Sequence, residues 1–466
     1  MAQAAIKSVE TPLTAVPLRF GTDGIRGHAE SFLNSKRCLE IGFCIGKVLS
    51  GSGPVLIGRD SRCSGEAMSY ALTAGLNAAG KEVWDLGLCP TPTIATLIKE
   101  SGAIGGLMVS ASHNPPEDNG IKVFGPNGSK LKSSDQRIIE SYLEEDLTGK
   151  ISQKTTNNNS NVTKHPELLT KYQRKLEAST KGQRLDGVSI VLDLCWGSAT
   201  AISAEVFTNL GAQVTVLHGQ PDGKRINVKC GSTNLLPLRK AVLETNAEMG
   251  FAFDGDADRM LAIDSKGRVI DGDHILYLWG SALREQNALP EQRLIATVMS
   301  NLGFEKAWED SGGLLERTAV GDQYVHTAML SSGAALGGEQ SGHILSSEHQ
   351  FAGDGLFTAI QLSTLCKSKG LTLTQWLDQS FTPFPQKLVN IHVPNKSIRR
   401  GWSNCQPLNE AILNAKEAMG NEGRVIVRAS GTQPLIRVMV EASDSGLVDS
   451  FSSKIACLAE QHLNAA

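Results

Sequence analysis

Runs of apolar residues alternate along this chain with stretches of helical periodicity, and the apolar runs end in polar turns. Such runs begin at Val55, Val188 and Leu294, and each leads into a turn that contains both glycine and serine. A short continuous apolar run bounded by turn residues is typical of a buried strand, so each run with its following helix predicts one α/β unit. The pattern indicates α/β layers in series, although no repeat of single residues connects them.

The chain after Pro385 follows a different pattern. Apolar residues at helical spacing (Leu408, Ile412, Ala415 and Met419) predict a helix that ends at Gly420. Residues 424–428 and 435–441 are expected to form strands, and Val448–Leu463 a second helix. This small α+β unit presents a Ser-Gly-Thr loop between Arg428 and Arg437. Hydroxyls, glycine and guanidinium groups suit a phosphate, although most loops of this composition are ordinary turns.

Length and composition limit the alternatives. A chain of 466 residues is too long for one core, and we expect three or four domains. The asparagine-rich stretch at residues 152–164 predicts a domain boundary, and the prolines of Thr382–Pro385 predict another break. A net charge of −3 gives no electrostatic reason to expect nucleic acid or an anionic membrane as partner.

The sequence also predicts a compartment. No apolar run approaches the ~20 residues of a membrane span, and residues 1–16 lack the pattern of a secretory signal. The nine cysteines are scattered and form no C-x-x-C pair, so we expect reduced thiols in a cytoplasmic protein. Cys195 and Cys230 stand in turn-like contexts next to glycine or close to it, and we interpret them as small buried hydrophobic residues.

The strongest chemical signal is the loop Asp254-Gly255-Asp256-Ala257-Asp258-Arg259, which follows the apolar stretch 249–253. In an extended backbone, alternate side chains point to the same side, so we expect the three carboxylates to converge on a cation. Hard oxygen ligands suit Mg²⁺, and Arg259 could reach a phosphate. A calcium-binding helix-loop-helix is excluded because Arg259 and Ser265 stand where it needs Gly and Glu. An acidic surface turn stays open as the alternative.

Two further segments carry polar groups suited to a ligand. Ser112 and His113 follow the apolar strand expected at residues 104–109, but the G-x-S-x-G elbow of a hydrolase is absent. Because neighbouring residues of a strand point opposite ways, His113 would be a poor base for Ser112. In Gly337–His343, glycines permit a close approach to a ligand, and Glu339, Ser341 and His343 suit hydroxyl groups. Taken separately, both segments could be simple turns.

Five segments together resemble the α-D-phosphohexomutase superfamily. They are, in the family's order, Phe20-Gly21-Thr22-Asp23-Gly24-Ile25-Arg26-Gly27, Ser110-Ala111-Ser112-His113-Asn114-Pro115, Asp254–Arg259, Gly337–His343 and Arg428-Ala429-Ser430-Gly431-Thr432-Gln433-Pro434. The match runs from about residue 18 to residue 441. Within the superfamily, residues 20–27, 320–325, 338–343 and 434–441 are most similar to bacterial phosphoglucosamine mutases.

The resemblance implies a fold of four domains around a central cleft, of which three are mixed α/β domains and the last is an α+β domain. We expect an N-terminal extension at residues 1–18, domain I at 19–164, domain II at 165–265, domain III at 266–382 and domain IV at 383–466. These domains would carry, in order, the phosphoserine loop, the metal-binding loop, the sugar-binding loop and the phosphate-binding loop.

The resemblance also implies an activity, namely exchange of a sugar phosphate between its 6- and 1-positions through a phosphoserine and a 1,6-bisphosphate. The expected product would feed UDP-N-acetylglucosamine and cell-wall synthesis. One Mg²⁺ per subunit and glucosamine or glucose 1,6-bisphosphate as activator are implied. We expect a monomer or homodimer, with a kinase or bisphosphate donor, still to be identified, that first phosphorylates the serine.

Residue roles follow from the matched positions. The phosphoserine Ser112 would join Asp254, Asp256 and Asp258 around the metal. Catalytic positions are expected at Ser112, Arg26, Lys122, Arg259 and His343. Glu339 and Ser341 would bind the sugar, and Arg428, Ser430, Gly431 and Thr432 would hold the phosphate that is not transferred.

Two positions depart from the pattern of phosphoglucosamine mutases. Gln323 stands where arginine is usual and Gln433 where glutamate is usual, so the grip on phosphate could differ slightly.

Two alternative functions are compatible with the same segments. A phosphomannomutase/phosphoglucomutase would use the same chemistry, and a non-catalytic sugar-phosphate binder could share the fold. The complete set of Ser112, Lys122, His343 and the three aspartates argues against a binder, which needs no phosphorylatable serine beside a metal.

Overall fold

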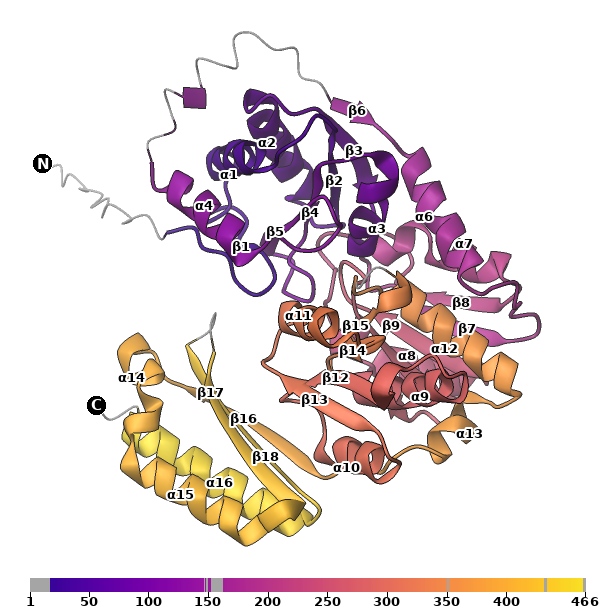
Figure 1. Ribbon diagram of the computed structural model, residues 1–466, viewed down its shortest axis with the longest axis vertical. Helices are drawn as coiled ribbons and strands as arrows, with labels where there is room; N and C mark the ends of the chain where they lie inside the picture. Colours follow the sequence, from indigo (N-terminus) through magenta and orange to yellow (C-terminus); the bar gives the residue numbers. More distant parts are fainter. Residues whose placement is uncertain are drawn as a thin grey trace, which may run out of the picture.

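The computed structural model describes residues 17–145, 147, 150–151, 162–349, 352–430 and 434–463. Within them the chain forms four units, each built on its own sheet (Figure 1). The strands predicted from the three apolar runs are confirmed as β2 (Val55–Arg59), β7 (Ser189–Asp193) and β12 (Arg293–Thr297). Among the described residues, no helix is long and apolar enough to cross a membrane.

The first unit has six strands in the order β1-β5-β4-β2-β3-β6. The other strands are β1 (Ile25–His28), β3 (Val83–Leu88), β4 (Gly105–Val109), β5 (Asp118–Phe124) and β6 (Val162–Lys164), and the helices are α1 (Ser35–Val48), α2 (Gly65–Ala78), α3 (Thr91–Ser101) and α4 (Ser133–Leu143). Strands β4, β2, β3 and β6 are parallel, whereas β5 runs antiparallel to both β4 and β1. The loop from β4 to β5 contains Ser112.

The second unit has five strands in the order β11-β10-β9-β7-β8. They are β8 (Gln213–Leu217), β9 (Met249–Phe253), β10 (Met260–Asp264) and β11 (Val269–Ile270) besides β7, with helices α6 (Glu167–Ala178), α7 (Ser203–Asn209) and α8 (Leu236–Thr245). Strands β8, β7 and β9 are parallel, so their carboxyl ends share one edge of the sheet. Asp254–Arg259 connect β9 to the antiparallel β10 at that edge.

The third unit has four strands in the order β13-β12-β14-β15. The remaining elements are β13 (Leu314–Thr318), β14 (Leu336–Gly338), β15 (Ile344–Ser346), α9 (Gly272–Glu285), α10 (Leu302–Asp310), α11 (Asp322–Ser332), α12 (Gly355–Lys369) and α13 (Leu373–Asp378). The loop from β14 to β15 contains Glu339 and Ser341. One continuous hydrophobic cluster runs from α3 of the first unit through the second and third units, which therefore pack as one body.

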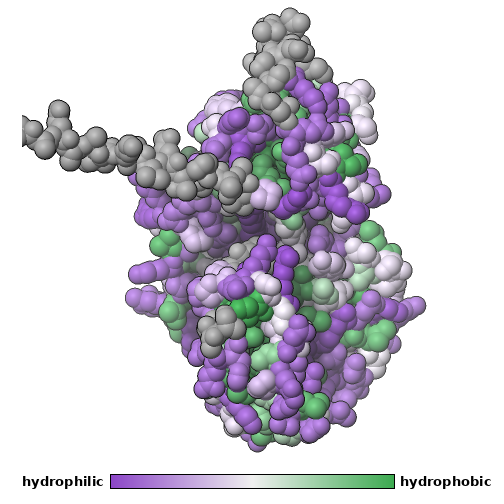
Figure 2. Space-filling model, turned by 90° about the vertical axis from the view of Figure 1, so that its left-hand side faces the viewer, coloured by the Kyte–Doolittle hydropathy of each residue, from purple (hydrophilic) through white to green (hydrophobic). Residues whose placement is uncertain are grey.

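The C-terminal unit confirms the predicted α+β pattern. Its strands are β16 (Gln386–His392), β17 (Gly423–Ala429) and β18 (Leu435–Ala442), in the antiparallel order β16-β18-β17, and its helices are α14 (Lys396–Arg400), α15 (Gln406–Met419) and α16 (Ser445–Leu463). The unit has a hydrophobic cluster of its own. Figure 1 shows it set apart at the lower left, and Figure 2 shows a recess between it and the first unit.

A few polar contacts attach this unit to the third one. The buried Glu441 carboxylate accepts hydrogen bonds from Arg424 Nε at 2.6 Å and from the backbone N–H of Leu302 at 3.1 Å. Arg424 Nη1 also donates to Val298 O at 3.0 Å. Because the C-terminal unit has a separate core and attaches through polar groups, it is suited to move as a body about residues 382–385.

Candidate active site

Loops from three units meet at the carboxyl ends of β4, β9 and β14. The buried Ser112 hydroxyl donates to Asp254 Oδ2 at 2.6 Å, which joins the first unit to the second. His343 Nδ1, from the third unit, lies 3.7 Å from Asp258 Oδ1. The predicted Ser112, metal and His343 positions therefore converge on one centre.

Ser112 has a strained backbone. Its φ angle is +54°, in the left-handed region that side chains other than glycine rarely occupy. The Ser110 hydroxyl supports this turn by accepting the Ser112 N–H at 2.8 Å and donating to Asp60 Oδ2 at 2.6 Å. The strand geometry assumed for Ser112 and His113 is therefore wrong, although the lowered pKa of His113 agrees with a poor base. Because Ser112 lies in a tight turn, its Oγ is 3.4 Å from His113 Nδ1.

The buried Arg62 guanidinium fixes the same loop. Its Nη2 donates to Ser112 O at 2.9 Å and to Asn114 O at 2.8 Å, and its Nη1 donates to Asp118 O at 2.8 Å and to Pro115 O. Asp60 Oδ2 accepts from Arg62 Nε at 3.0 Å. From the sequence alone, residues 58–62 are recognisable only as a turn. The available sequence signal was the pair Asp60 and Arg62 directly after a buried strand. The carbonyl groups that Arg62 contacts lie about fifty residues further along the chain.

The three aspartates converge, but not through an extended backbone. Residues 254–259 form a tight turn between β9 and β10, with Ala257 at φ +58°. One carboxylate oxygen from each of Asp254, Asp256 and Asp258 lies within 4.8 Å of the others. Asp256 Oδ1 and Asp258 Oδ1 are buried without a hydrogen-bond partner. Buried carboxylate oxygens that lack donors fit a hard cation, so the residues suit a metal site.

Lys122 places its ammonium group among the carboxylates of the site. Its Nζ lies 2.5 Å from Asp258 Oδ2, 2.7 Å from Asp256 Oδ2 and 3.2 Å from Asp23 Oδ2. Burial alone would lower the pKa of Lys122, but these carboxylates raise it well above its ordinary value. Burial, together with the charges of Asp258 and Asp256, raises the pKa of Asp254. The excess of negative charge would be relieved by a divalent cation.

Two arginines and a histidine line the opening of the centre. Arg26 forms an ion pair with Asp23, and its Nη1 lies 3.4 Å from Asn114 Oδ1. Arg259 Nη1 lies 3.3 Å from His113 Nδ1. Burial, and then the charges of Arg259 and Arg26, lower the pKa of His113 to about 3, so its ring is neutral. The Nε atoms of Arg26 and Arg259 are buried without a hydrogen-bond partner, which suits an anion at this opening. Asp23 was not among the predicted site residues, although it stands in the Phe20–Gly27 segment.

The β14–β15 loop presents Glu339 and Ser341. Glu339 Oε1 accepts the Gly321 N–H at 3.0 Å, and Ser341 Oγ lies 3.4 Å from Glu339 Oε2. The turn requires Gly342, which has φ +86° and whose added Cβ would lie 2.1 Å from Met260 O. His343 Nε2 is 3.5 Å from Asp322 Oδ2. This arrangement holds a carboxylate and a hydroxyl on one side of the centre.

The C-terminal loop places two like charges together. Arg428 of β17 stands directly opposite Arg437 of β18 in the sheet register. Burial, followed by the charge of Arg437, lowers the pKa of Arg428. Like charges directly opposite each other in a sheet are unfavourable unless an anion lies between them. Ser430 N donates to Leu435 O at 2.8 Å. The predicted Gly431 and Thr432, like Gln433, lie outside the described residues.

A cavity of about 830 Å³ opens beside the centre, between residues 124–135 of the first unit and α11 of the third. Asp258 and His343 line its inner end, and Gln323 lines its wall. Lys130 spans this side by pairing with Asp322 Oδ2 at 2.7 Å and with Asp23. The volume suffices for a small polar ligand next to the carboxylates.

Comparison with known proteins identifies the family. Models of phosphoglucomutase/phosphomannomutase match four parts of the chain, namely α/β/α domain I at residues 17–150, domain II at 167–267, domain III at 271–384 and the C-terminal domain at 388–457. Phosphoglucosamine mutase of Prochlorococcus marinus (strain MIT 9303) is 61% identical over 464 residues, covering 100% of this chain and 99% of the relative. The chain belongs to the phosphoglucosamine mutase family. Phosphoglucosamine mutase of Parasynechococcus marenigrum (strain WH8102) is 59% identical over 466 residues, all of both chains.

Solved structures agree on the fold. A phosphoglucomutase/phosphomannomutase family protein from Burkholderia thailandensis aligns with a TM-score of 0.76 at 22% identity, covering 94% of this chain and 97% of that one. N-acetylphosphoglucosamine mutase of Aspergillus fumigatus, in complex with GlcNAc-6P and magnesium, aligns with a TM-score of 0.66 at 18% identity, covering 96% of each chain. As a member of the phosphoglucosamine mutase family, the chain is an enzyme of the isomerase class.

Proposed function

We propose that this enzyme interconverts glucosamine 6-phosphate and glucosamine 1-phosphate by passing a phosphoryl group between Ser112 and the sugar. One observation carries the proposal. The Ser112 hydroxyl lies in a strained, buried turn, 2.6 Å from the first of three carboxylates that converge on a cation-sized site. A serine held in this way beside a metal site suits phosphoryl transfer better than simple binding.

The metal would be Mg²⁺, one per subunit, held by Asp254, Asp256, Asp258 and an oxygen of phosphorylated Ser112. When bound, it would neutralise charge on the phosphoryl group during transfer. The donor set supports this choice, because it consists of oxygen atoms, two of which have no hydrogen-bond partner.

The cationic side chains would stabilise the phosphoryl group from the protein side. The Lys122 ammonium, fixed by its carboxylate partners, lies next to Asp256 and Asp258, and Arg26 and Arg259 flank the Ser112 loop. Preorganised charges of this kind stabilise the charge that develops during transfer. We assign His343 to move the proton of the attacking or leaving sugar hydroxyl, because it lines the cavity beside Asp258. The raised pKa of Lys122 keeps its ammonium charged next to the carboxylates.

The sugar would be held at two further places. Glu339 and Ser341 present a carboxylate and a hydroxyl that suit ring hydroxyl groups, and Arg428, Ser430, Gly431 and Thr432 would bind the phosphate that is not transferred. Phosphorylation of O1 gives a 1,6-bisphosphate, which turns over in the cleft and returns its O6 phosphate to Ser112. Glucosamine or glucose 1,6-bisphosphate would act as activator by restoring the phosphoserine.

The predicted domains 19–164, 165–265, 266–382 and 383–466 would contribute one loop each.

Every one of the nine cysteines is a free thiol, and on this basis we place the enzyme in the cytoplasm.

The proposal is tested by incubating the purified chain with glucosamine 6-phosphate, Mg²⁺ and glucose 1,6-bisphosphate, and following the phosphorus NMR spectrum. Formation of glucosamine 1-phosphate by the wild type, together with its loss in Ser112→Ala, is the expected result. No conversion by the phosphorylated wild type would overturn the proposed function.

A further inference from the structure

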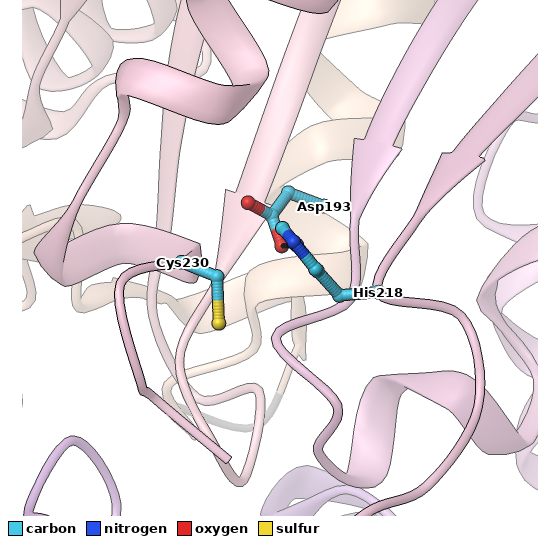
Figure 3. Close-up of side chains that lie close together, drawn as sticks. All are labelled: Asp193, His218 and Cys230. Carbon is cyan, nitrogen blue, oxygen red and sulfur yellow. Dashed lines mark hydrogen bonds and ion pairs between the residues drawn. The ribbon is translucent and has the colours of Figure 1, made fainter. Parts of the chain in front are cut away.

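A second polar cluster lies behind the Ser112 loop, where the carboxyl ends of β7 and β8 meet. Asp193 ends β7, His218 follows β8, and Cys230 precedes the turn Gly231–Thr233 (Figure 3). Cys195, which is fully buried like Cys230, places its Sγ 3.9 Å from Cys230 Sγ. The proposed mutase chemistry uses none of these groups.

The Asp193 carboxylate holds the two cysteines next to each other. Its Oδ1 accepts from the Cys195 N–H at 3.0 Å and lies 2.8 Å from His218 Nδ1. Its Oδ2 accepts from the N–H of Gly231, the residue after Cys230, at 3.0 Å. One carboxylate thus fixes the backbone beside each sulfur, so the thiol pair is preorganised rather than a chance contact.

The backbone around the pair is strained. Cys195, Trp196, His218, Asn227 and Lys229 all have positive φ angles, between 51° and 62°. Residues held in this region cost about 1–3 kcal/mol each and gather at functional or switching sites. These residues lie in the turn after β7 and in residues 218–229 after β8, the two parts of the chain that carry Cys195 and precede Cys230.

Asn227 connects the thiols to the phosphoserine loop. The Cys195 thiol donates to Asn227 Oδ1 at 3.0 Å. The amide of the same side chain donates from Nδ2 to Ser112 O at 2.8 Å and to Asn114 O at 3.0 Å. Any change at Cys195 that removes its S–H therefore reaches the backbone of the nucleophile through one side chain.

We propose that Cys195 and Cys230 form a reversible disulfide that lowers the mutase activity by releasing Asn227 and with it the Ser112 loop. This inference rests on the proposed function only for its readout in activity. Bonded sulfur atoms lie ~2.05 Å apart, so the two sulfurs must close about half of their 3.9 Å separation. Bond formation removes the Cys195 proton that Asn227 Oδ1 accepts.

A peroxide is an oxidant small enough for this buried pair. The Cys230 thiolate attacks one peroxide oxygen, the O–O bond breaks, and water leaves with the thiol proton to give a sulfenic acid. The Cys195 sulfur then attacks that sulfur, the S–S bond forms, the S–O bond breaks, and a second water leaves. Two thiols and one hydrogen peroxide become one disulfide and two waters. The hydrogen bond to Asp193 raises the pKa of His218, which favours protonation of the imidazole, and positive charge within 4.8 Å of Cys230 would favour its thiolate.

The test treats the full-length phosphorylated enzyme with hydrogen peroxide, blocks the remaining thiols with N-ethylmaleimide, and maps disulfide-linked peptides by mass spectrometry. The kcat for glucosamine 6-phosphate is measured before oxidation, after it, and after dithiothreitol. We expect a Cys195–Cys230 peptide, a fall in kcat of roughly 10- to 100-fold, typical of a small displacement at a reacting group, and recovery on reduction.

Variants separate the pair from other thiols. Cys195→Ser keeps a donor for Asn227, so it should retain activity and resist peroxide, and Cys230→Ser should also resist peroxide. Cys366→Ser, which changes another buried thiol, should stay as sensitive as the wild type. The inference is overturned if the pair stays reduced, if the disulfide forms with unchanged kcat, or if the purified protein holds zinc on these two sulfurs. The rate of untreated enzyme tests the proposed function separately.

Discussion

At the scale of single residues, the centre combines a strained serine with a group of carboxylates that outnumber their nearest cation. Asp23, Asp256 and Asp258 all contact the Lys122 ammonium, and Asp254 accepts from Ser112. The consequence is an excess of negative charge that a bound divalent cation would balance. Substitution of a single group in this set is therefore expected to change metal binding or turnover.

Ser112→Ala removes the oxygen that is proposed to carry the phosphoryl group. We expect kcat to fall by several orders of magnitude with an unchanged fold, because the loop is held by Arg62 and Ser110 and not by the Ser112 hydroxyl. Intact-mass analysis of the wild type should show a population one phosphate heavier, with the modification on Ser112. Near-normal turnover by the alanine variant would rule out the phosphoserine mechanism.

Asp256→Asn takes one negative charge from the middle of the carboxylate group. Mg²⁺ should bind ~10-fold more weakly or worse, since ligand charge sets affinity for hard cations, and excess Mg²⁺ should restore activity only in part. Calorimetric titration measures the binding. Asp186→Asn, an exposed carboxylate of the same unit, is the control and should leave binding unchanged. Full wild-type activity in EDTA would contradict the metal site.

Ser112, His343 and the three aspartates could be proposed from the sequence because each stands in a recognisable segment, and Lys122 because its position matches the family. The structure places these side chains close together, and their roles stay predictions. Arg62 and Asp23 were missed as site residues, because their importance arises from partners that only the folded chain brings near. The extended backbone assumed for residues 254–258 was also wrong, since alternation along the sequence does not distinguish a strand from a tight turn.

At the scale of elements, the site is built from strand ends. Strands β4 and β9 were recognisable as apolar runs, whereas β14 was not predicted as a strand, and the loops after the three strands meet at one centre. The geometry of each loop is set by anchors outside it, as Arg62 anchors residues 112–118 through four carbonyl oxygens. Sequence patterns predict the strands and do not predict these anchors.

Arg62→Lys tests the anchor. A lysine ammonium has three donors and no planar fork, so it cannot replace the guanidinium contacts. We expect kcat to fall on the order of 100-fold through displacement of Ser112, with a smaller change in KM. The matched control is Arg59→Lys. Arg59 ends strand β2, which precedes Arg62, and it pairs with Asp85 in a partly exposed position. Equal effects of the two changes on kcat would refute the anchoring role.

At the scale of the whole molecule, one hydrophobic cluster continues through the first three units, although the first also has a cluster of its own, and the core of the fourth is separate. The polar contacts of Arg424 and Glu441 with the third unit suit a C-terminal unit that would approach and leave the centre while the carboxylate cluster stays in place. A mutase needs this arrangement, because its substrate must be held by one phosphate while the other is transferred, and the bisphosphate must turn over.

Arg428→Gln should weaken the grip on the distant phosphate. Loss of a charged hydrogen bond of about 1.5–3 kcal/mol corresponds to a rise in KM of roughly 10- to 100-fold for every sugar phosphate the enzyme accepts. Steady-state kinetics measures it, with Arg400→Gln, an exposed arginine of the same unit, as control. An unchanged KM would remove Arg428 from the phosphate-binding loop.

The most direct test compares kcat/KM for glucosamine 6-phosphate and glucose 6-phosphate, which differ only at C2. Purified enzyme, added 1,6-bisphosphate and a coupled assay for each 1-phosphate product are needed. We predict turnover of both sugars with glucosamine 6-phosphate preferred by ~10- to 1000-fold, the worth of one charged contact at C2. Glu339→Ala should damage both reactions similarly. A clear preference for glucose or mannose phosphate would contradict the proposed substrate and make the enzyme a phosphoglucomutase or phosphomannomutase.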